Sequence, residues 1–386
     1  MAASFDVEAV RRRFSSLAGG FVFLDAPGGA QVPDEVGEAI ARTLREASGN
    51  LGAPYETGRR VEEVMARARQ RGADFLGCAP DEVVYGANMT TLNFALTRTA
   101  ARAWREGDEI LVTKLDHDGN VAPWLELAHD RGFVVRLVDV HDDLTLDYDD
   151  FARQLTERTR AVAFPFASNA VATLNDGARV CTLAREVGAI SWIDAVHAAA
   201  HEAIDVAALG ADVLLCSPYK FCGPHLGLAF VRRELAETWR PYKARPAPTL
   251  PVGRRFETGT PPFELLAGAA TAFDYLDSIG GMGAIGAYER SLGERFLSGL
   301  PSSVTVYGVP TMDGRVPTFL LNVDGVAAAD VATRLAERGL GVWAHDNWYC
   351  LGLAERLPRE SVRVGFIHYN TADEVDTLLS ELARLA

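Results

Sequence analysis

Lysine is scarce in this sequence: only Lys114, Lys220 and Lys243 stand among 38 basic residues, and the rest are arginines. Because arginine stays protonated, any reaction that needs a primary amine has three candidate residues. Cysteine is scarce as well, with five widely spaced residues and no C-x-x-C pair. An odd number without paired spacing argues against a disulfide framework and against a structural zinc site, so we expect no metal.

Long apolar runs and clusters of positive charge are also missing. No segment reaches the ~18 consecutive apolar residues that a membrane span requires. The first residues lack the basic segment and apolar core of a secretory signal, so we expect a soluble, cytoplasmic protein without a membrane partner. A net charge of -14 repels phosphate backbones, and we therefore expect no nucleic-acid partner.

The length and the alternation of apolar runs predict an α/β protein with two domains. A chain of 386 residues exceeds what one hydrophobic core usually organises. Between residues 21 and 233, short apolar or β-branched runs alternate with amphipathic stretches, which is typical of β-α-β units around a mostly parallel sheet. Strands are predicted at Glu82–Tyr85, Glu109–Thr113, Val134–Val138, Ala161–Phe164, Ile190–Ile193, Val213–Leu215 and Leu228–Val231.

The remainder of the chain predicts a smaller α+β domain. A stretch rich in proline and arginine at 240–248 breaks the alternation and predicts an exposed loop. A long helix is predicted over 262–279, and an N-terminal helix over 7–17 is expected to pack with the C-terminal tail. We place the large domain at 20–255 and the small domain at 1–19 and 256–386.

Asp194 and Lys220 follow two of the predicted strands, and this pair points to a chemistry. Ligand groups in open α/β sheets gather at the carboxyl ends of strands, so both residues are expected over one crevice. A pyridine cofactor needs a carboxylate to keep its ring nitrogen protonated and an amine to hold its aldehyde as an imine. The plain alternative is a helix-capping Asp and a surface lysine.

Two further segments fit the same crevice. Gly86–Thr91 follows a strand and opens a helix, so its amides and hydroxyls form an anion site that suits a phosphate. Asn and Thr are, however, also ordinary helix caps. His117 stands just beyond the strand Glu109–Thr113, where its ring could lie flat on a bound cofactor, although a lone loop histidine is often only structural.

These residues belong to motifs that lie in order along almost the whole chain. They resemble the class V aminotransferase superfamily, and specifically its cysteine desulfurase-like branch. The resemblance rests on Asp194-Ala195-Val196-His197, Ser217–Pro224, Phe23-Leu24-Asp25, Asp116-His117 with Asn120, Pro123-Trp124, Ser168-Asn169 with Thr173, Glu257–Pro261, Val362-Arg363 and Tyr369–Asp376.

The resemblance implies a fold of the type I pyridoxal-phosphate-dependent transferases and pyridoxal 5'-phosphate as cofactor. Lys220 resembles the Schiff-base lysine, Asp194 the partner of the pyridine nitrogen, and His117 the residue that stacks on the ring. Arg363 resembles the arginine that binds the substrate carboxylate, a role that suits its planar fork. The other implied cofactor contacts are Asn88, Met89, Thr90, Asn169, His197, Ser217, Tyr219 and Thr260.

A small amino acid is the implied substrate, and a homodimer with shared active sites is implied by Thr260, whose equivalent reaches the phosphate of the other subunit. The sequence leaves the reaction open. In desulfurases a cysteine thiolate shortly before the carboxylate-binding arginine attacks the substrate sulfur. Cys350 stands thirteen residues before Arg363, but its aromatic neighbours predict a packed wall and an inert thiol.

We therefore rank a C–S or β-lyase, or an epimerase, ahead of a true desulfurase that uses Cys350, and aminotransfer after both. Proteins of two other classes are further alternatives. A dinucleotide-binding protein would carry G-x-G-x-x-G after the first strand, whereas Asp25–Ala30 lacks the third glycine and contains a proline. A scaffold of the same fold would keep Lys220 without turnover.

Overall fold

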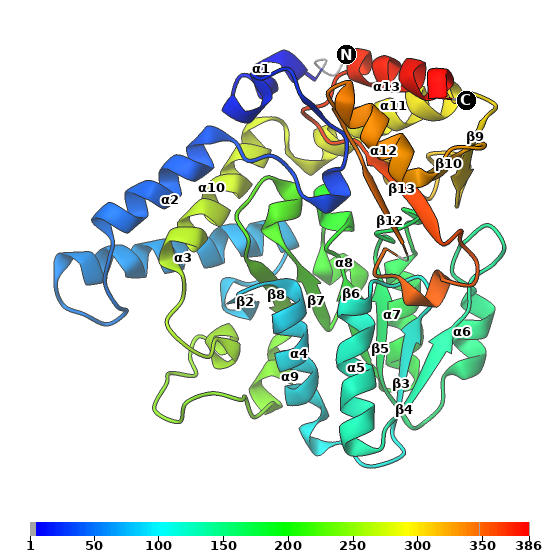
Figure 1. Ribbon diagram of the computed structural model, residues 1–386. Coiled ribbons are helices and arrows are strands. Elements are labelled where there is room, and N and C mark those ends of the chain that lie inside the picture. Colours follow the sequence, from blue (N-terminus) through cyan, green and yellow to red (C-terminus); the bar gives the residue numbers. More distant parts are fainter. Residues whose placement is uncertain (1–4, 347, 386) are drawn as a thin grey trace.

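The computed structural model describes residues 5–346 and 348–385, and its centre is a seven-stranded sheet (Figure 1). The strand order is β2-β8-β7-β6-β5-β3-β4. Only β8 runs antiparallel to its neighbours, and the other adjacent pairs are parallel. The strands are β2 Val83–Gly86, β3 Glu109–Thr113, β4 Val134–Val138, β5 Thr159–Pro165, β6 Ile190–Asp194, β7 Val213–Cys216 and β8 Gly227–Val231.

These strands are largely apolar because helices cover both faces of the sheet. The helices of this part are α4 Met89–Ala100, α5 Asp118–Arg131, α6 Tyr148–Gln154, α7 Gly177–Glu186, α8 Val206–Leu209 and α9 Arg233–Thr238. On the side of α4 and α5, Trp192 packs edge-on against Trp124 with ring centroids 5.0 Å apart. All seven predicted strands are confirmed, each within two residues of its expected bounds.

Three long helices form an arm beside the large sheet (Figure 1). They are α2 Asp34–Glu46, α3 Glu56–Leu76 and α10 Phe263–Ser278, and α10 packs along both of the others. The helix predicted over 262–279 is therefore confirmed as α10. No helix in the described part of the chain is long and apolar enough to cross a membrane.

A second, four-stranded antiparallel sheet lies above the carboxyl ends of the large sheet (Figure 1). Its order is β12-β13-β10-β9. The elements here are β9 Val304–Tyr307, β10 Thr318–Val323, β12 Trp343–Asp346, β13 Glu360–Gly365, α11 Gly281–Ser298, α12 Ala328–Glu337 and α13 Ala372–Leu385.

The N-terminal segment belongs with this smaller sheet. Helix α1 covers only Val7–Arg11, so the prediction of a helix to residue 17 is wrong. Phe14 adopts an extended backbone, because its ring turns into the core against Tyr275 and Tyr369. The expected packing against the tail is confirmed, since Arg11 donates to the Tyr369 carbonyl and pairs with Glu374.

A short parallel pair joins the start of the chain to its C-terminal part. Strand β1, Val22–Phe23, pairs with β11, Leu340–Gly341. The proposed division of the chain at residues 19 and 255 stays a prediction, and this pairing crosses it. The turn that follows β1 is consequently held between the two sheets.

A buried cluster of charged and polar side chains joins α10 and α11 to the C-terminal segment before α13. It consists of Glu289, His201, His368 and Tyr275. Glu289 of α11 is fully buried and lies 2.7 Å from His201 Nδ1, and it accepts from the His368 amide at 2.8 Å. The Tyr275 hydroxyl lies 2.8 Å from His368 Nε2. Burial would raise the pKa of the Glu289 carboxyl, but the two histidines hold it below its ordinary value.

Glu289→Ala should lower the free energy of unfolding by about 3–5 kcal/mol, because two buried histidines and an amide lose their acceptor. The free energy of the first unfolding transition in urea measures the effect. Glu294→Ala is the matched control on the same helix, since Glu294 is exposed in its pair with Arg290 and should change stability by less than about 1 kcal/mol. Equal effects of the two changes would contradict this account of the cluster.

Candidate active site

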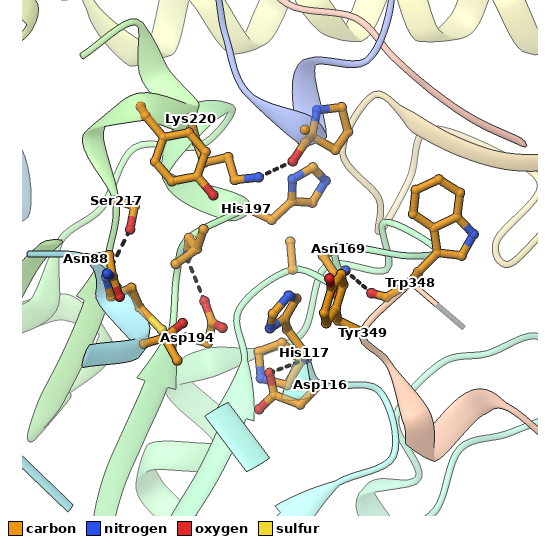
Figure 2. A pocket seen from close by; sticks show the side chains of 18 of the residues that line it. Asn88, Asp116, His117, Asn169, Asp194, His197, Ser217, Lys220, Trp348 and Tyr349 are labelled. Atoms are coloured by element: carbon orange, nitrogen blue, oxygen red, sulfur yellow. Dashed lines mark hydrogen bonds between the residues drawn. The ribbon is translucent and has the colours of Figure 1, made fainter. Parts of the chain in front are cut away.

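A cavity of about 500 Å³ lies over the carboxyl ends of the central strands, between the two sheets. This volume falls in the range of small-molecule sites. Most of the side chains predicted for the site converge on it, as Figure 2 shows. The predicted residues that line it are Asn88, Met89, Thr90, His117, Asn169, Asp194, His197, Ser217, Tyr219, Lys220 and Arg363.

Lys220 projects from a short turn of 3-10 helix, Pro218–Phe221, directly after β7. Cys222 closes the turn in the left-handed region, with φ of 66°. The amine of Lys220 donates to the Pro27 carbonyl. Burial and the charge of Arg363 together lower the pKa of this amine to about 7, against the opposing charges of Asp25 and Asp194. A substantial fraction of the amine is therefore neutral near pH 7.

Asp194 ends β6 and is the buried carboxylate of the cavity. One of its oxygens accepts from the Val196 amide at 2.8 Å. Burial raises the pKa of Asp194 to about 6, although this hydrogen bond and Lys220 favour the charged form. Asp116 lies beside it with its pKa also raised by burial and by Asp194, and it accepts from Asn120 at 2.7 Å. A cationic group that meets Asp194 would restore its charge.

His117 is the N-cap of α5, and its ring orientation is fixed by the helix start. Its Nδ1 accepts from the Gly119 amide at 2.8 Å. Burial, together with the nearby charges of Lys220 and Arg363, lowers the pKa of His117 to about 4. The ring is therefore neutral, and it stacks with Tyr349 at a centroid distance of 5.5 Å and an interplanar angle of 18°.

The start of α4 lies at the cavity, where the sequence predicts an anion site for a phosphate. Asn88 caps this helix of 12 residues, and its side chain accepts from the Thr91 amide at 2.8 Å. Ser217, from the turn that carries Lys220, accepts from the Met89 amide at 3.3 Å. Thr90 and Ser217 line the cavity together with Lys220, so the positive end of the helix dipole lies at this cavity.

Arg363 extends from β13 into the cavity and is almost completely buried. Its Nε and Nη2 donate to Asp25 Oδ1 at 3.2 and 3.1 Å, and its Nη1 donates to the Asn169 carbonyl at 3.2 Å. The indole of Trp348 covers the guanidinium at 4.4 Å. The sequence identified Arg363 but missed Asp25 as a residue of the site.

Two polar atoms of the cavity show whether a cofactor fits there. His197 Nε2 and Asn169 Oδ1 are buried, and within the described residues neither has a hydrogen-bond partner. Asn169 instead uses its amide nitrogen to donate to the Trp348 carbonyl at 2.8 Å. Buried polar atoms without partners are costly. A ring with polar substituents would fit here, together with the amine, the carboxylate and the anion site.

Two predicted residues do not line the cavity. Thr260 is exposed on the loop before α10. Cys350 is fully buried, and its thiol donates to the Lys114 carbonyl at 3.6 Å. Burial, with Asp116 nearby, raises the pKa of the Cys350 thiol. Trp348 and Tyr349 line the cavity instead, as the predicted aromatic wall, and both have left-handed backbones with φ of 55° and 54°.

Several lining residues escaped the sequence analysis. Asp116 was noted only as part of a motif, and Trp343 and His225 carried no local signal. The turn after β1 lacks a dinucleotide-binding pattern, so its sequence predicts no ligand site. The only signal was an Asp before Pro-Gly-Gly after a short apolar run. The missed residues of the cavity are Pro27, Gly28, Asp116, Pro165, Ala167, Val196, His225 and Trp343, with Asp25 behind them.

Comparison with known proteins gives one consistent family. The family model described as aminotransferase class V matches residues 22–378. A probable cysteine desulfurase of Mycobacterium leprae is 33% identical, and the match covers 98% of this chain and 96% of that protein. An aminotransferase-like protein of Gibberella zeae is 30% identical, with 98% of each chain covered.

A solved structure agrees with these sequence matches. The apo cysteine desulfurase of Thermococcus onnurineus superposes with a TM-score of 0.93 at 26% identity, and the match covers 100% of this chain and 99% of that one. The predicted fold, that of the type I pyridoxal-phosphate enzymes with a mostly parallel sheet, is thereby confirmed. So is the predicted resemblance to the cysteine desulfurase-like branch.

In the cofactor-free protein, amine labelling of Lys220 at a series of pH values should give a midpoint near 7, as burial predicts. Asp194→Asn should lower this midpoint, because Asp194 favours the charged amine. Arg363→Met should raise it, because Arg363 disfavours that form. A parent midpoint close to the ordinary value of 10.5, or shifts of the opposite sign, would contradict the electrostatics of the site.

Proposed function

Because this chain belongs to the class V aminotransferase family, and is thus a pyridoxal-phosphate-dependent enzyme of its cysteine desulfurase-like branch, we propose that it acts on a small amino acid through Lys220. The observation that carries the proposal is the Lys220 amine, with its pKa lowered to about 7, in one cavity with Asp194 and Arg363. We propose C–S or β-lyase chemistry, or epimerisation at Cα, as the reaction. A true desulfurase that uses Cys350 and an aminotransferase are the alternatives.

The residues of the cavity supply a place for each part of the cofactor. Lys220 would hold the aldehyde as an imine, the start of α4 with Ser217 would hold the phosphate, and Asp194 would hold the proton of the ring nitrogen. His117 would contact the ring, and His197 and Asn169 have unpartnered atoms for its polar groups. The cofactor supplies an electron sink for charge that develops at the substrate Cα.

The other steps belong to side chains of this chain. Arg363 would bind the substrate carboxylate with its remaining N–H donors. Once Lys220 is free of the imine, its amine, with its lowered pKa, would take the proton from the substrate Cα. It would then return this proton to Cα or pass it to a leaving group. Trp343, Trp348 and Tyr349 line the cavity and would limit the access of water to the reacting carbon.

The position of Cys350 supports lyase or epimerase chemistry over sulfur transfer. A desulfurase needs a thiolate that reaches the substrate, whereas this thiol is buried, bonded to the Lys114 carbonyl and has a raised pKa. The names of the relatives favour the desulfurase alternative. The two readings differ in whether turnover requires Cys350.

The remaining parts of the proposal concern the assembly and its surroundings. We propose a homodimer in which Thr260 reaches the phosphate bound by the partner subunit, because Thr260 is exposed outside the cavity of its own chain. A cytoplasmic location is proposed from the sequence alone. A screen of amino acids, with separate detection of sulfide, keto acid and racemised substrate, identifies the reaction.

The purified holoenzyme should be yellow, and borohydride should bleach the colour and fix the cofactor on Lys220, because a reduced imine is stable to digestion. Peptide mapping measures the site of attachment. Lys114→Arg and Lys243→Arg serve as controls and should retain the colour and the label. A label on either of those lysines, or no imine band with excess cofactor, would refute the central role of Lys220.

Cys350→Ala should retain at least about a tenth of parent turnover, a loss of less than about 1.4 kcal/mol of barrier, because Lys220 carries the proton chemistry without a thiol. Steady-state turnover on the substrate found in the screen measures this. The matched control is Cys181→Ala, which removes another buried thiol, on α7. A loss of about a thousandfold or more, with an extra sulfur trapped on Cys350 after treatment with cysteine, would establish the desulfurase alternative.

A further inference from the structure

The turn from Asp25 to Gly29 contacts both sides of the active site. Its Pro27 carbonyl accepts from the Lys220 amine, and the Ala30 amide just after it donates to the Tyr219 carbonyl at 3.1 Å. At its other end, the Gly365 amide donates to the Leu24 carbonyl at 2.7 Å. The turn therefore joins the segment that carries Lys220 to the strand that carries Arg363.

Within this turn, Asp25 contacts Arg363 directly. Its Oδ1 accepts from both Nε and Nη2 of Arg363, at 3.2 and 3.1 Å. The two residues are 338 positions apart in the chain. Both side chains are shielded from solvent, with 21% and 4% of the side-chain surface exposed for Asp25 and Arg363. In a shielded pair, the loss of one partner leaves the other charge without compensation, unlike in a surface ion pair.

The contacts of Arg363 leave it with few free donors. A guanidinium has five N–H groups. Asp25 takes two of them and the Asn169 carbonyl takes one on Nη1. Among the described residues, one N–H on each of Nη1 and Nη2 remains without a partner, which suits two hydrogen bonds to a single carboxylate. The arrangement thus fits an amino acid bound by one carboxylate.

The plane of the guanidinium is fixed as well as its edge. The Trp348 ring covers one face at 4.4 Å. Asn169 connects these contacts, because its side chain donates to the Trp348 carbonyl while its own carbonyl accepts from Arg363. The direction of the two remaining donors is consequently set before a ligand arrives, which saves the entropy of orienting a long side chain.

Gly28 allows the Asp25 carboxylate to occupy this place. A Cβ at Gly28 would lie 2.2 Å from Asp25 Oδ2, well inside the contact distance of the two atoms. Gly29 follows with φ of 155°, which L side chains rarely adopt. Gly28 is thus required by the close approach of the carboxylate, and Gly29 by its own backbone conformation.

We propose that Asp25 is a positioning residue for substrate recognition, which holds one edge of the Arg363 guanidinium so that its remaining donors face the carboxylate of the substrate. This inference rests on the proposed role of Arg363. Charge and orientation predict opposite results when Asp25 loses its charge. If charge alone mattered, Asp25→Asn would strengthen the attraction of Arg363 for a carboxylate. If orientation matters, the same change weakens carboxylate recognition.

Two aminooxy probes that differ in a carboxylate separate these possibilities. Aminooxyacetate carries a carboxylate and methoxyamine does not. With the holoenzyme, each replaces the Lys220 nitrogen on the cofactor carbon and releases the lysine as a free amine, which the loss of the yellow colour reports. The ratio of the two second-order rate constants measures carboxylate recognition, and the methoxyamine rate measures whether the variant is folded and carries an intact imine.

Asp25→Asn should lower the ratio by about tenfold or more while the methoxyamine rate changes by less than about threefold, because only the oriented contact is lost. Asp25→Glu, which keeps the charge but displaces it, should lower the ratio in the same direction, and it decides the question if Asp25→Asn fails to load cofactor. Asp118→Asn is the charge control, since Asp118 is half-buried but makes no contact with Arg363, and it should leave both rates unchanged.

Arg363→Ala separates the failure of this inference from the failure of the proposed function. An unchanged ratio in Arg363→Ala would remove Arg363, and with it Asp25, from carboxylate recognition. A lowered ratio in Arg363→Ala with an unchanged or raised ratio in Asp25→Asn would overturn the positioning role alone. A parallel fall of both probe rates in Asp25→Asn and Asp25→Glu would show that Asp25 acts on the imine rather than on the carboxylate, and would also overturn it.

Discussion

Two positive groups, the Lys220 amine and the Arg363 guanidinium, are buried in one cavity, and the rest of the site is arranged around that constraint. Burial lowers the pKa of each, so each needs compensation. Asp25 accepts from Arg363, and Asp194 and Asp25 both favour the charged form of Lys220. The result is an amine with a pKa of about 7 and an arginine that stays charged. Proton transfer requires the first, and carboxylate binding requires the second.

The position of these groups follows from the topology of the two sheets. Asp194 ends β6 and Lys220 follows β7, and the carboxyl ends of these adjacent parallel strands meet at the same edge. Arg363 comes from the antiparallel strand β13 of the smaller sheet, above that edge. The cavity is thus made by two structural units, and the pairing of β1 with β11 fixes the turn at Asp25 between them.

Much of the large sheet and half of the site's chemistry could be predicted because they are recorded locally in the sequence. Apolar runs gave the seven strands, and the strand-end rule placed Asp194, Lys220 and the start of α4 over one crevice. The end of α1 could not be predicted, because Phe14 leaves the helix to contact Tyr275 and Tyr369, which are distant in the sequence. Asp25 was missed as a site residue for the same reason, since its partner lies at the other end of the chain.

The division of the ligand contacts between the two sheets also couples binding to global stability. A ligand that is held by Lys220 on one side and by Arg363 on the other binds only when both units are folded and apposed. By mass action such a ligand stabilises the native state over every state in which the units have separated or unfolded. Occupancy of the cavity is therefore a determinant of how long the chain survives proteolysis, independently of any reaction that it catalyses.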